Sequence, residues 1–171
     1  EKRKSELEYN DSVLDTVSRA ESERELAQIR EELTEQGYLR KQKGKQRPQA
    51  ALPPLEFTSS DGFKILVGRN NTQNDKLTLK IANKNDMWLH TKDIHGSHTV
   101  VFAEGREISD TAILEAAQLA AYYSKARESS QVPVDYTLVR YVSKPSGARP
   151  GMVIYVNNKT VYVTPKANIS E

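Results

Sequence analysis

The 171-residue sequence contains no cysteine, which excludes both disulfide bonds and thiolate metal sites. It also lacks any apolar run close to the roughly 18 residues that a membrane-spanning helix needs, and no signal peptide is visible. No Walker A loop, dinucleotide fingerprint or G-x-S-x-G elbow occurs. The length suits one domain of ordinary size that folds without covalent staples in a reducing compartment.

Charge is distributed unevenly along the chain, although the net charge is only +2. Residues 1–37 carry 11 acidic and 6 basic side chains, whereas residues 38–47 carry 5 basic side chains and no acidic one. A cationic segment of this kind favours RNA or another polyanion, because neutralised phosphates release counterions. A solvated tether is the alternative interpretation of the same residues.

Three segments are predicted from composition and periodicity. Residues 1–37 have apolar residues at helical spacing and a capping box at Ser22–Glu25, so we expect a helical coiled-coil arm, with an isolated solvated helix as the alternative. Residues 38–54 contain three prolines and no periodicity, which predicts a basic linker. Residues 55–171 are expected to form the compact domain.

The domain is predicted to be α+β, with a mostly antiparallel sheet packed on one main helix. Asp61-Gly62 predicts a hairpin between two strands, and small residues at helical spacing predict the main helix over 111–127. Residues 132–142 alternate as one long strand, and 152–163 resemble a terminal hairpin. Residues 74–82 fit a strand or a short helix, and the capping residues before them favour the helix.

Residues 86–98 hold the only tryptophan and all three histidines, followed by a further apolar run. The pattern predicts two strands meeting at a tight turn. The histidine spacing fits no standard zinc motif, and Ser97 and His98 are neighbours whose side chains point to opposite faces of a strand, so no catalytic set is predicted. Trp88 suits either a stacking platform for a nucleobase or the core of the domain.

Several motifs in a fixed order resemble the NFACT-R domain family, whose members stand at the C-terminal end of fibronectin-binding protein A, RqcH and NEMF proteins. The resemblance covers residues 57–165 and points to a bacterial, Gram-positive member, with the N-terminal helices as the distal part of the family's coiled-coil arm. His95 is a departure, because the family usually has proline there. The matching motifs are Asp61-Gly62-Phe63, Val67-Gly68-Arg69-Asn70-Asn71, Gln73-Asn74-Asp75-x-Leu77-Thr78, Asp86-x-Trp88-x-His90-Thr91-Lys92, Gly96-Ser97-His98, Glu115-Ala116-Ala117, Ser124-Lys125-Ala126, Val134-Asp135-Tyr136-Thr137 and Lys144-Pro145-x-Gly147-Ala148-x-Pro150-Gly151.

The resemblance implies a non-catalytic role in ribosome-associated quality control. Family members bind a large ribosomal subunit that carries an obstructed nascent chain, and they recruit tRNA for template-free tailing, with alanine in bacteria. The expected partners are therefore the large subunit and tRNA, with no cofactor, no metal, no membrane insertion and a cytoplasmic location. Gram-positive members are also described as adhesins, so binding of fibronectin or fibrinogen at the cell surface is the alternative. A nuclease-type enzyme is a third hypothesis, which rests only on the clustering of the three histidines.

The predicted RNA-binding residues are those able to donate hydrogen bonds to phosphate, ribose or base edges. Within this set, His90, Lys92, Ser97 and His98 are expected to face the partner while Trp88 holds the fold. The full set is Arg69, Asn70, Asn74, His90, Lys92, Ser97, His98, Lys125, Lys144 and Arg149.

Overall fold

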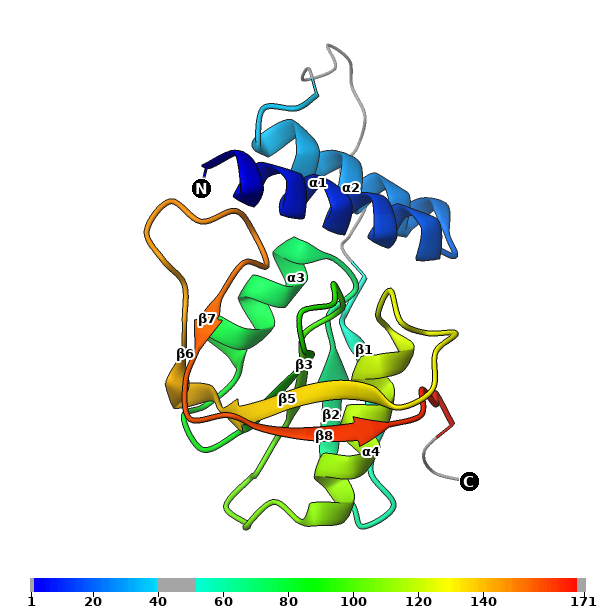
Figure 1. Cartoon of the computed structure of the whole chain (residues 1–171), viewed down its shortest axis with the longest axis vertical. Coiled ribbons are helices and arrows are strands. Elements are labelled where there is room, and N and C mark those ends of the chain that lie inside the picture. Colours follow the sequence, from blue (N-terminus) through cyan, green and yellow to red (C-terminus); the bar gives the residue numbers. More distant parts are fainter. Residues whose placement is uncertain (1, 40–51, 169–171) are drawn as a thin grey trace.

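The computed structural model describes residues 2–39 and 52–168. Two N-terminal helices lie on one end of an α+β domain, and the first strand of the sheet begins at Leu55 (Figure 1). Most of the predicted basic linker lies outside the described residues. The helical elements are α1 (Lys2–Arg19), α2 (Glu23–Glu35), α3 (Asn71–Lys76), the π-helical turn η1 (Leu77–Ile81), α4 (Asp110–Tyr122) and the 3-10 turn η2 (Val139–Tyr141).

Six strands form one sheet in the order β1-β2-β4-β3-β5-β8, and every neighbouring pair is antiparallel. A short separate ribbon pairs β6 with β7. The predicted fold class is therefore confirmed. The strands are β1 (Leu55–Thr58), β2 (Lys64–Val67), β3 (Met87–Thr91), β4 (Thr99–Val101), β5 (Val132–Leu138), β6 (Val142–Ser143), β7 (Ile154–Tyr155) and β8 (Lys159–Val163).

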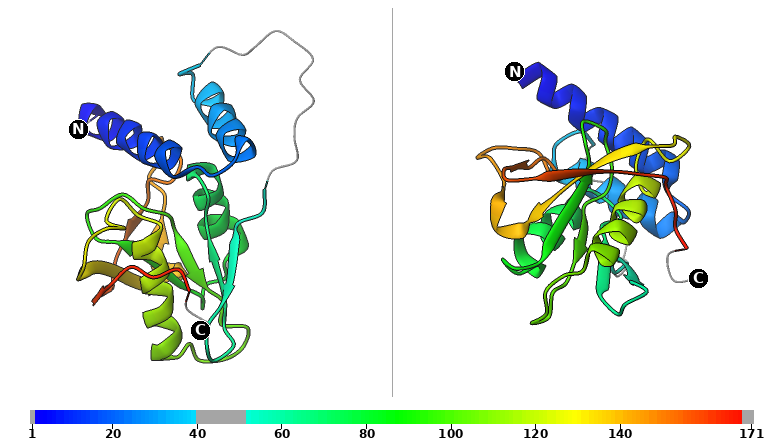
Figure 2. Two further views of the ribbon diagram at one scale, coloured as in Figure 1. Left: turned by 90° about the vertical axis from the view of Figure 1, so that its right-hand side faces the viewer. Right: turned by 60° about the horizontal axis from the view of Figure 1, so that its bottom comes forward.

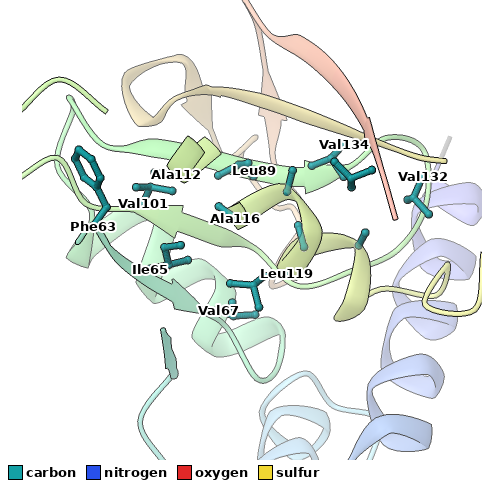
Figure 3. Packing of buried hydrophobic residues seen from close by; sticks show 14 of the residues in the cluster. Phe63, Ile65, Val67, Leu89, Val101, Ala112, Ala116, Leu119, Val132 and Val134 are labelled. Atoms are coloured by element: carbon teal, nitrogen blue, oxygen red, sulfur yellow. The ribbon is translucent and has the colours of Figure 1, made fainter. Parts of the chain in front are cut away.

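Helix α4 covers one face of the sheet, as Figure 2 shows. Its buried face consists largely of alanines, so its backbone can approach the strands closely. Ser109 caps the helix by accepting a 3.0 Å hydrogen bond from the Ala112 amide. The core that results contains Phe63, Ile65, Val67, Leu89, Val101, Ala112, Ala116, Leu119, Val132 and Val134 (Figure 3).

The opposite face of the sheet buries a second apolar cluster around Trp88. The cluster also contains Leu66 of β2, Val100 of β4 and Leu77 of η1. Trp88 is 1% exposed, so the prediction that it holds the fold is confirmed. The prediction of a helix over 74–82 is also confirmed, since α3 and η1 together span residues 71–81.

Two predicted boundaries and one predicted strand pairing were wrong. The main helix ends at Tyr122, because Tyr123 leaves the helical region at φ −92° and ψ 43°. The long strand ends at Leu138, where the chain turns into η2. Residues 152–163 form no hairpin: β7 pairs with β6 and β8 pairs with β5, because the long sheet partner of β8 offers more backbone hydrogen bonds than β7 does.

The connection between β3 and β4 is longer than the predicted tight turn. Residues 92–98 form a loop that is fixed at Gly96 by a bridge to Ser124, after the end of α4. A Cβ at Gly96 would lie 2.8 Å from the Ser124 Cβ, so the close approach requires glycine. The two strands themselves are antiparallel neighbours, as predicted.

The buried cluster of the arm agrees only in part with the apolar pattern of the sequence. Among the apolar positions at helical spacing, Ile29 is buried and Leu33 packs against it, whereas Leu7 and Leu14 are 64% and 68% exposed, and Tyr9 and Val13 are buried instead. The predicted capping box is largely confirmed. Ser22 accepts from the Glu25 amide at 3.2 Å, and the Glu25 carboxylate reaches back to the Glu21 amide at 3.1 Å.

Candidate nucleic-acid interface

His98 is a core residue, which corrects the expectation that it faces a partner. It is 1% exposed. Its Nδ1 lies 2.7 Å from the Thr78 hydroxyl and its Nε2 lies 3.0 Å from the Gly151 carbonyl oxygen. A neutral ring protonated at Nε2 satisfies both contacts, donating to Gly151 and accepting from Thr78. The histidine thus ties η1 to the loop that precedes β7.

His90 and His95 are also largely enclosed by the chain. The His90 ring is parallel to Trp88 at 5.7 Å between centroids, and its nitrogens lie 2.7 Å and 3.1 Å from the carbonyl oxygens of Thr91 and Gly96. His95 Nε2 lies 3.9 Å from the Asp15 carboxylate. Burial is the main reason that the pKa of His90 is lowered and that of His95 falls to about 3, so His95 is neutral and forms no ion pair with Asp15 at pH 7.

Acid should destabilise the protein through these histidines. Burial lowers the pKa of His98 to about 3, against about 6.5 in the unfolded chain. Between these values the unfolded chain binds a proton that the folded chain does not, so unfolding becomes easier by about 1.4 kcal/mol per pH unit for each such histidine. We expect the urea concentration at the unfolding midpoint to fall as the pH is lowered from about 7.5 to about 5.5. This pH window lies above the ordinary carboxyl pKa values.

His98→Gln should reduce this pH slope, because the variant lacks one of the titrating groups. Its midpoint at pH 7.5 should also fall, since glutamine cannot keep both ring contacts. A midpoint of the natural sequence that stays constant or rises as the pH falls through this window would contradict the assignment.

The predicted amide and hydroxyl residues are buried as well. Asn70 caps α3 by accepting from the Gln73 amide at 2.9 Å, and Asn74 accepts from the His98 amide at 3.1 Å. Ser97 is 5% exposed, and its amide donates to the Tyr123 carbonyl at 2.9 Å. These three residues hold backbone segments together, so the expectation that Ser97 faces a partner was wrong.

Three of the predicted cations pair with carboxylates of the arm helices. Arg69 Nη1 lies 2.7 Å from Glu25, and Lys125 Nζ lies 2.9 Å from Asp11. Arg149 Nη2 lies 2.6 Å from the Glu6 carboxylate. Lys144 pairs with Asp75 inside the domain. The charge on these side chains is therefore already compensated within the chain.

A buried carboxylate lies at the centre of the contact between the arm and the domain. Glu32 of α2 is 3% exposed. It accepts hydrogen bonds from the Tyr9 hydroxyl, the Asn71 side-chain amide at 3.4 Å and the Thr72 amide at 3.0 Å and hydroxyl at 3.2 Å. Because these donors come from α1 and from the start of α3, Glu32 joins both arm helices to the domain.

Lys92 is the one predicted cation that is exposed with no carboxylate at salt-bridge distance in residues 2–39 and 52–168. Among the exposed cations that were not predicted, four lie on η1 and the segments next to it or bonded to it. We call Lys76, Lys80, Lys84 and Arg140 the lysine ridge. The spacing of Lys76 and Lys80 was visible in the sequence, but it gains meaning only once residues 71–81 are known to be helical, and Lys84 lies in the turn that follows.

A cleft of about 940 Å³ lies between α1 and the loop 145–155, beside the three histidines. The indole Nε1 of Trp88 is buried without a hydrogen-bond partner in the described part of the chain. The charged lining residues are Lys2, Lys4, Arg149, Glu6, Glu8, Asp11 and Asp93. Because three cations face four carboxylates, the cleft does not select for phosphate.

Within the described ranges, no group of three or more histidine, aspartate or glutamate side chains is arranged to hold a metal ion. No helix in those ranges is long and apolar enough to cross a membrane.

Comparison with known proteins gives consistent matches along the chain. Residues 54–157 match the NFACT protein RNA binding domain, and residues 1–51 match the NFACT N-terminal and middle domains. The Rqc2 homolog RqcH of Bacillus subtilis (strain 168) is 50% identical over 166 residues, which cover 95% of this chain and 29% of the relative. The Rqc2 homolog RqcH of Streptococcus suis (strain 05ZYH33) is 45% identical, with 96% and 30% covered.

A solved structure has the same fold. The C-terminal part of the fibronectin/fibrinogen-binding protein from Streptococcus suis superposes with a TM-score of 0.89 at 44% identity, covering 95% of this chain and 65% of that one. This chain thus spans less than a third of the length of the curated relatives named above. Because the RNA-binding domain match covers more than half of the sequence and runs in the order of the family's domains, the chain belongs to the NFACT family.

Proposed function

We propose that this chain is the RNA-binding end of a ribosome quality control factor. In this proposal it contacts a large ribosomal subunit carrying an obstructed nascent chain, together with tRNA, and supports alanine tailing without itself being an enzyme. The match of residues 54–157 to the NFACT RNA binding domain carries the proposal. The bonding of the buried histidines to other parts of the chain favours a binding role over a catalytic one.

Binding to tRNA or to large-subunit RNA is expected to weaken steeply with salt. Each phosphate contact to a single strand should contribute a slope of about 0.7 in the logarithm of Kd against the logarithm of salt concentration. Lys92→Ala should raise Kd and lower the salt slope by about 0.7, the value for one phosphate contact. Fluorescence anisotropy of the whole chain from about 50 to 300 mM salt measures both quantities. An affinity that does not change with salt would sink the proposal.

Arg69→Ala distinguishes RNA contact from arm docking when RNA affinity and hydrogen exchange are both measured on the variant. Because Arg69 is paired with Glu25, its loss should change hydrogen exchange in α2 more than it changes RNA affinity. A loss of RNA affinity as large as that of Lys92→Ala, with unchanged exchange in α2, would assign Arg69 to the RNA instead.

Adhesion is the second candidate function, and the name of the Streptococcus suis neighbour is the observation that favours it. The free edges of the sheet, β1 and β8, are the surfaces that could add a strand of a matrix protein. Capture of residues 52–171 by immobilised fibronectin or fibrinogen, no better than capture of an unrelated protein of equal charge, would count against it. The quality-control proposal places the protein in the cytoplasm, whereas the adhesin would act at the cell surface.

A further inference from the structure

The helical run formed by α3 and η1 has two ends with different surroundings. Its first residues, Asn71 and Thr72, bind the buried Glu32 carboxylate of the arm. Its other end runs away from the arm along the side of the domain (Figure 1). There Leu77 and Thr78 are buried, and the outward side carries Lys76 and Lys80. π-helical turns are frequent at functional sites, so this end is a candidate ligand surface.

Positive charge is concentrated and uncompensated at this end. Residues 76–85 contain three lysines and no acidic residue. In the described ranges, no carboxylate lies within ion-pair distance of Lys76, Lys80 or Lys84. Asp86, the next acidic residue along the chain, is 2% exposed and accepts from the amides of Asn83 and Ala103, so it is turned away from the surface.

Arg140 adds a fourth charge from a distant part of the sequence. Its Nε donates to the Lys84 carbonyl at 3.3 Å, and its guanidinium also donates to the Asn85 side chain. These bonds hold η2 against the turn after η1, and the two segments lie side by side in Figures 1 and 2. The lysine ridge is therefore assembled by the tertiary fold.

Apolar and aromatic surface accompanies these cations. Leu79 and Ile81 are 41% and 40% exposed, and Tyr141 next to Arg140 is 37% exposed. Exposed cations together with an exposed aromatic side chain next to one of them in the chain suit a single-stranded nucleic acid, because cations can follow the phosphates while the ring stacks on a base.

We propose that the lysine ridge contacts the RNA backbone and that Tyr141 stacks on an unpaired base. This inference rests on the proposed RNA-binding function and assigns it to a surface. The ridge suits the role better than Arg69, Lys125 and Arg149, since those side chains are neutralised by arm carboxylates. Counterion release favours cations without an internal partner.

The test compares two triple variants of the whole chain, Lys76→Ala/Lys80→Ala/Lys84→Ala and the control Lys4→Ala/Lys159→Ala/Lys166→Ala. Both remove three charges from exposed lysines, so folding should be retained and circular dichroism checks it. The probe is a labelled single-stranded RNA of about 20 nucleotides, measured by anisotropy across a salt series. Loss of three phosphate contacts should raise Kd on the order of 100-fold at about 0.1 M salt and lower the salt slope by about 2.

The control triple should shift Kd far less, and Tyr141→Ala should weaken binding while leaving the salt slope unchanged. Equal losses in the two triples, or no loss in either, would overturn the ridge while leaving RNA binding by the chain intact. Absence of salt-dependent binding by the natural sequence would overturn the proposed function and the ridge together. Tighter binding of poly-glutamate than of RNA would assign the ridge to an acidic protein and overturn the RNA assignment.

Discussion

Replacing Glu32 with alanine is expected to release the arm helices from the domain. The substitution removes the acceptor of the buried Tyr9 hydroxyl and of one N–H of the buried Asn71 amide, and also that of the exposed Thr72. Leaving buried donors unsatisfied costs about 1–3 kcal/mol for each group, so we expect a loss of about 3 kcal/mol in the stability of the docked state. Hydrogen exchange of the α1 and α2 amides should become faster by about 100-fold.

Glu31→Ala is the matched control, because Glu31 is its neighbour on α2 and is exposed. Glu32→Gln keeps one acceptor oxygen and should fall between the control and Glu32→Ala. The domain amides of β3 and β5 should keep their protection in all three variants, since the arm lies outside the sheet. Equal exchange rates in Glu31→Ala and Glu32→Ala would show that Glu32 does not hold the arm.

Trp88→Ala is expected to lower the free energy of unfolding by about 3–5 kcal/mol, because it removes a large side chain that is 1% exposed. The lost contacts include Tyr155, whose ring centroid lies 4.7 Å away, and His98 at 5.3 Å. Trp88→Phe should cost much less than Trp88→Ala, because the indole Nε1 has no partner within the described residues and its loss removes no hydrogen bond there. Urea unfolding followed by circular dichroism measures both.

Tyr162→Ala provides the control for Trp88, since Tyr162 is an aromatic residue of the same sheet that is 63% exposed. Its loss should change the midpoint little. The fluorescence of Trp88 should be blue-shifted and should stay unquenched when RNA is added. Quenching of this emission by RNA, or a midpoint of Trp88→Ala equal to that of Tyr162→Ala, would contradict the assignment of Trp88 to the core.

Docking through Glu32 also bears on the proposed RNA surface. The run of α3 and η1 holds the arm at one end and carries two residues of the lysine ridge, Lys76 and Lys80, toward the other. Because this run is short and packed against the sheet through Leu77, docking through Glu32 fixes the arm relative to the ridge. If the ridge binds RNA as proposed, the arm is held in one orientation relative to that RNA.

Local patterns were sufficient for elements whose stability depends on neighbouring residues. The Asp61-Gly62 hairpin, the Ser22 cap and the alanine-rich face of α4 follow from turn chemistry, capping and helical spacing, which act within a few residues. The prediction of a terminal hairpin was wrong because strand pairing depends on residues outside the local sequence. β7 and β8 each found a better partner elsewhere in the chain, and strand partners far apart in sequence leave no local signal.

The candidate site depended still more on the tertiary structure. The sequence predicted Arg69, Lys125 and Arg149 as donors to RNA. Nothing local in the sequence indicates that carboxylates of the arm lie opposite them, namely Glu25, Asp11 and Glu6. The lysine ridge was overlooked because the lack of ion-pair partners for its lysines is known only from the fold, and because Arg140 joins it from 56 residues away through the Lys84 carbonyl.

The sequence by itself determined the α+β class, the family and the place of the helices, because periodicity, caps and motifs are written in consecutive residues. Only the tertiary structure decided which polar groups remain available to a partner. Availability depends on burial and on charge compensation, and both are set by residues distant in sequence. For this chain, folding turned His98 into a core contact, turned Arg69 into an arm contact, and left Lys76, Lys80 and Lys84 exposed without an ion pair among the described residues.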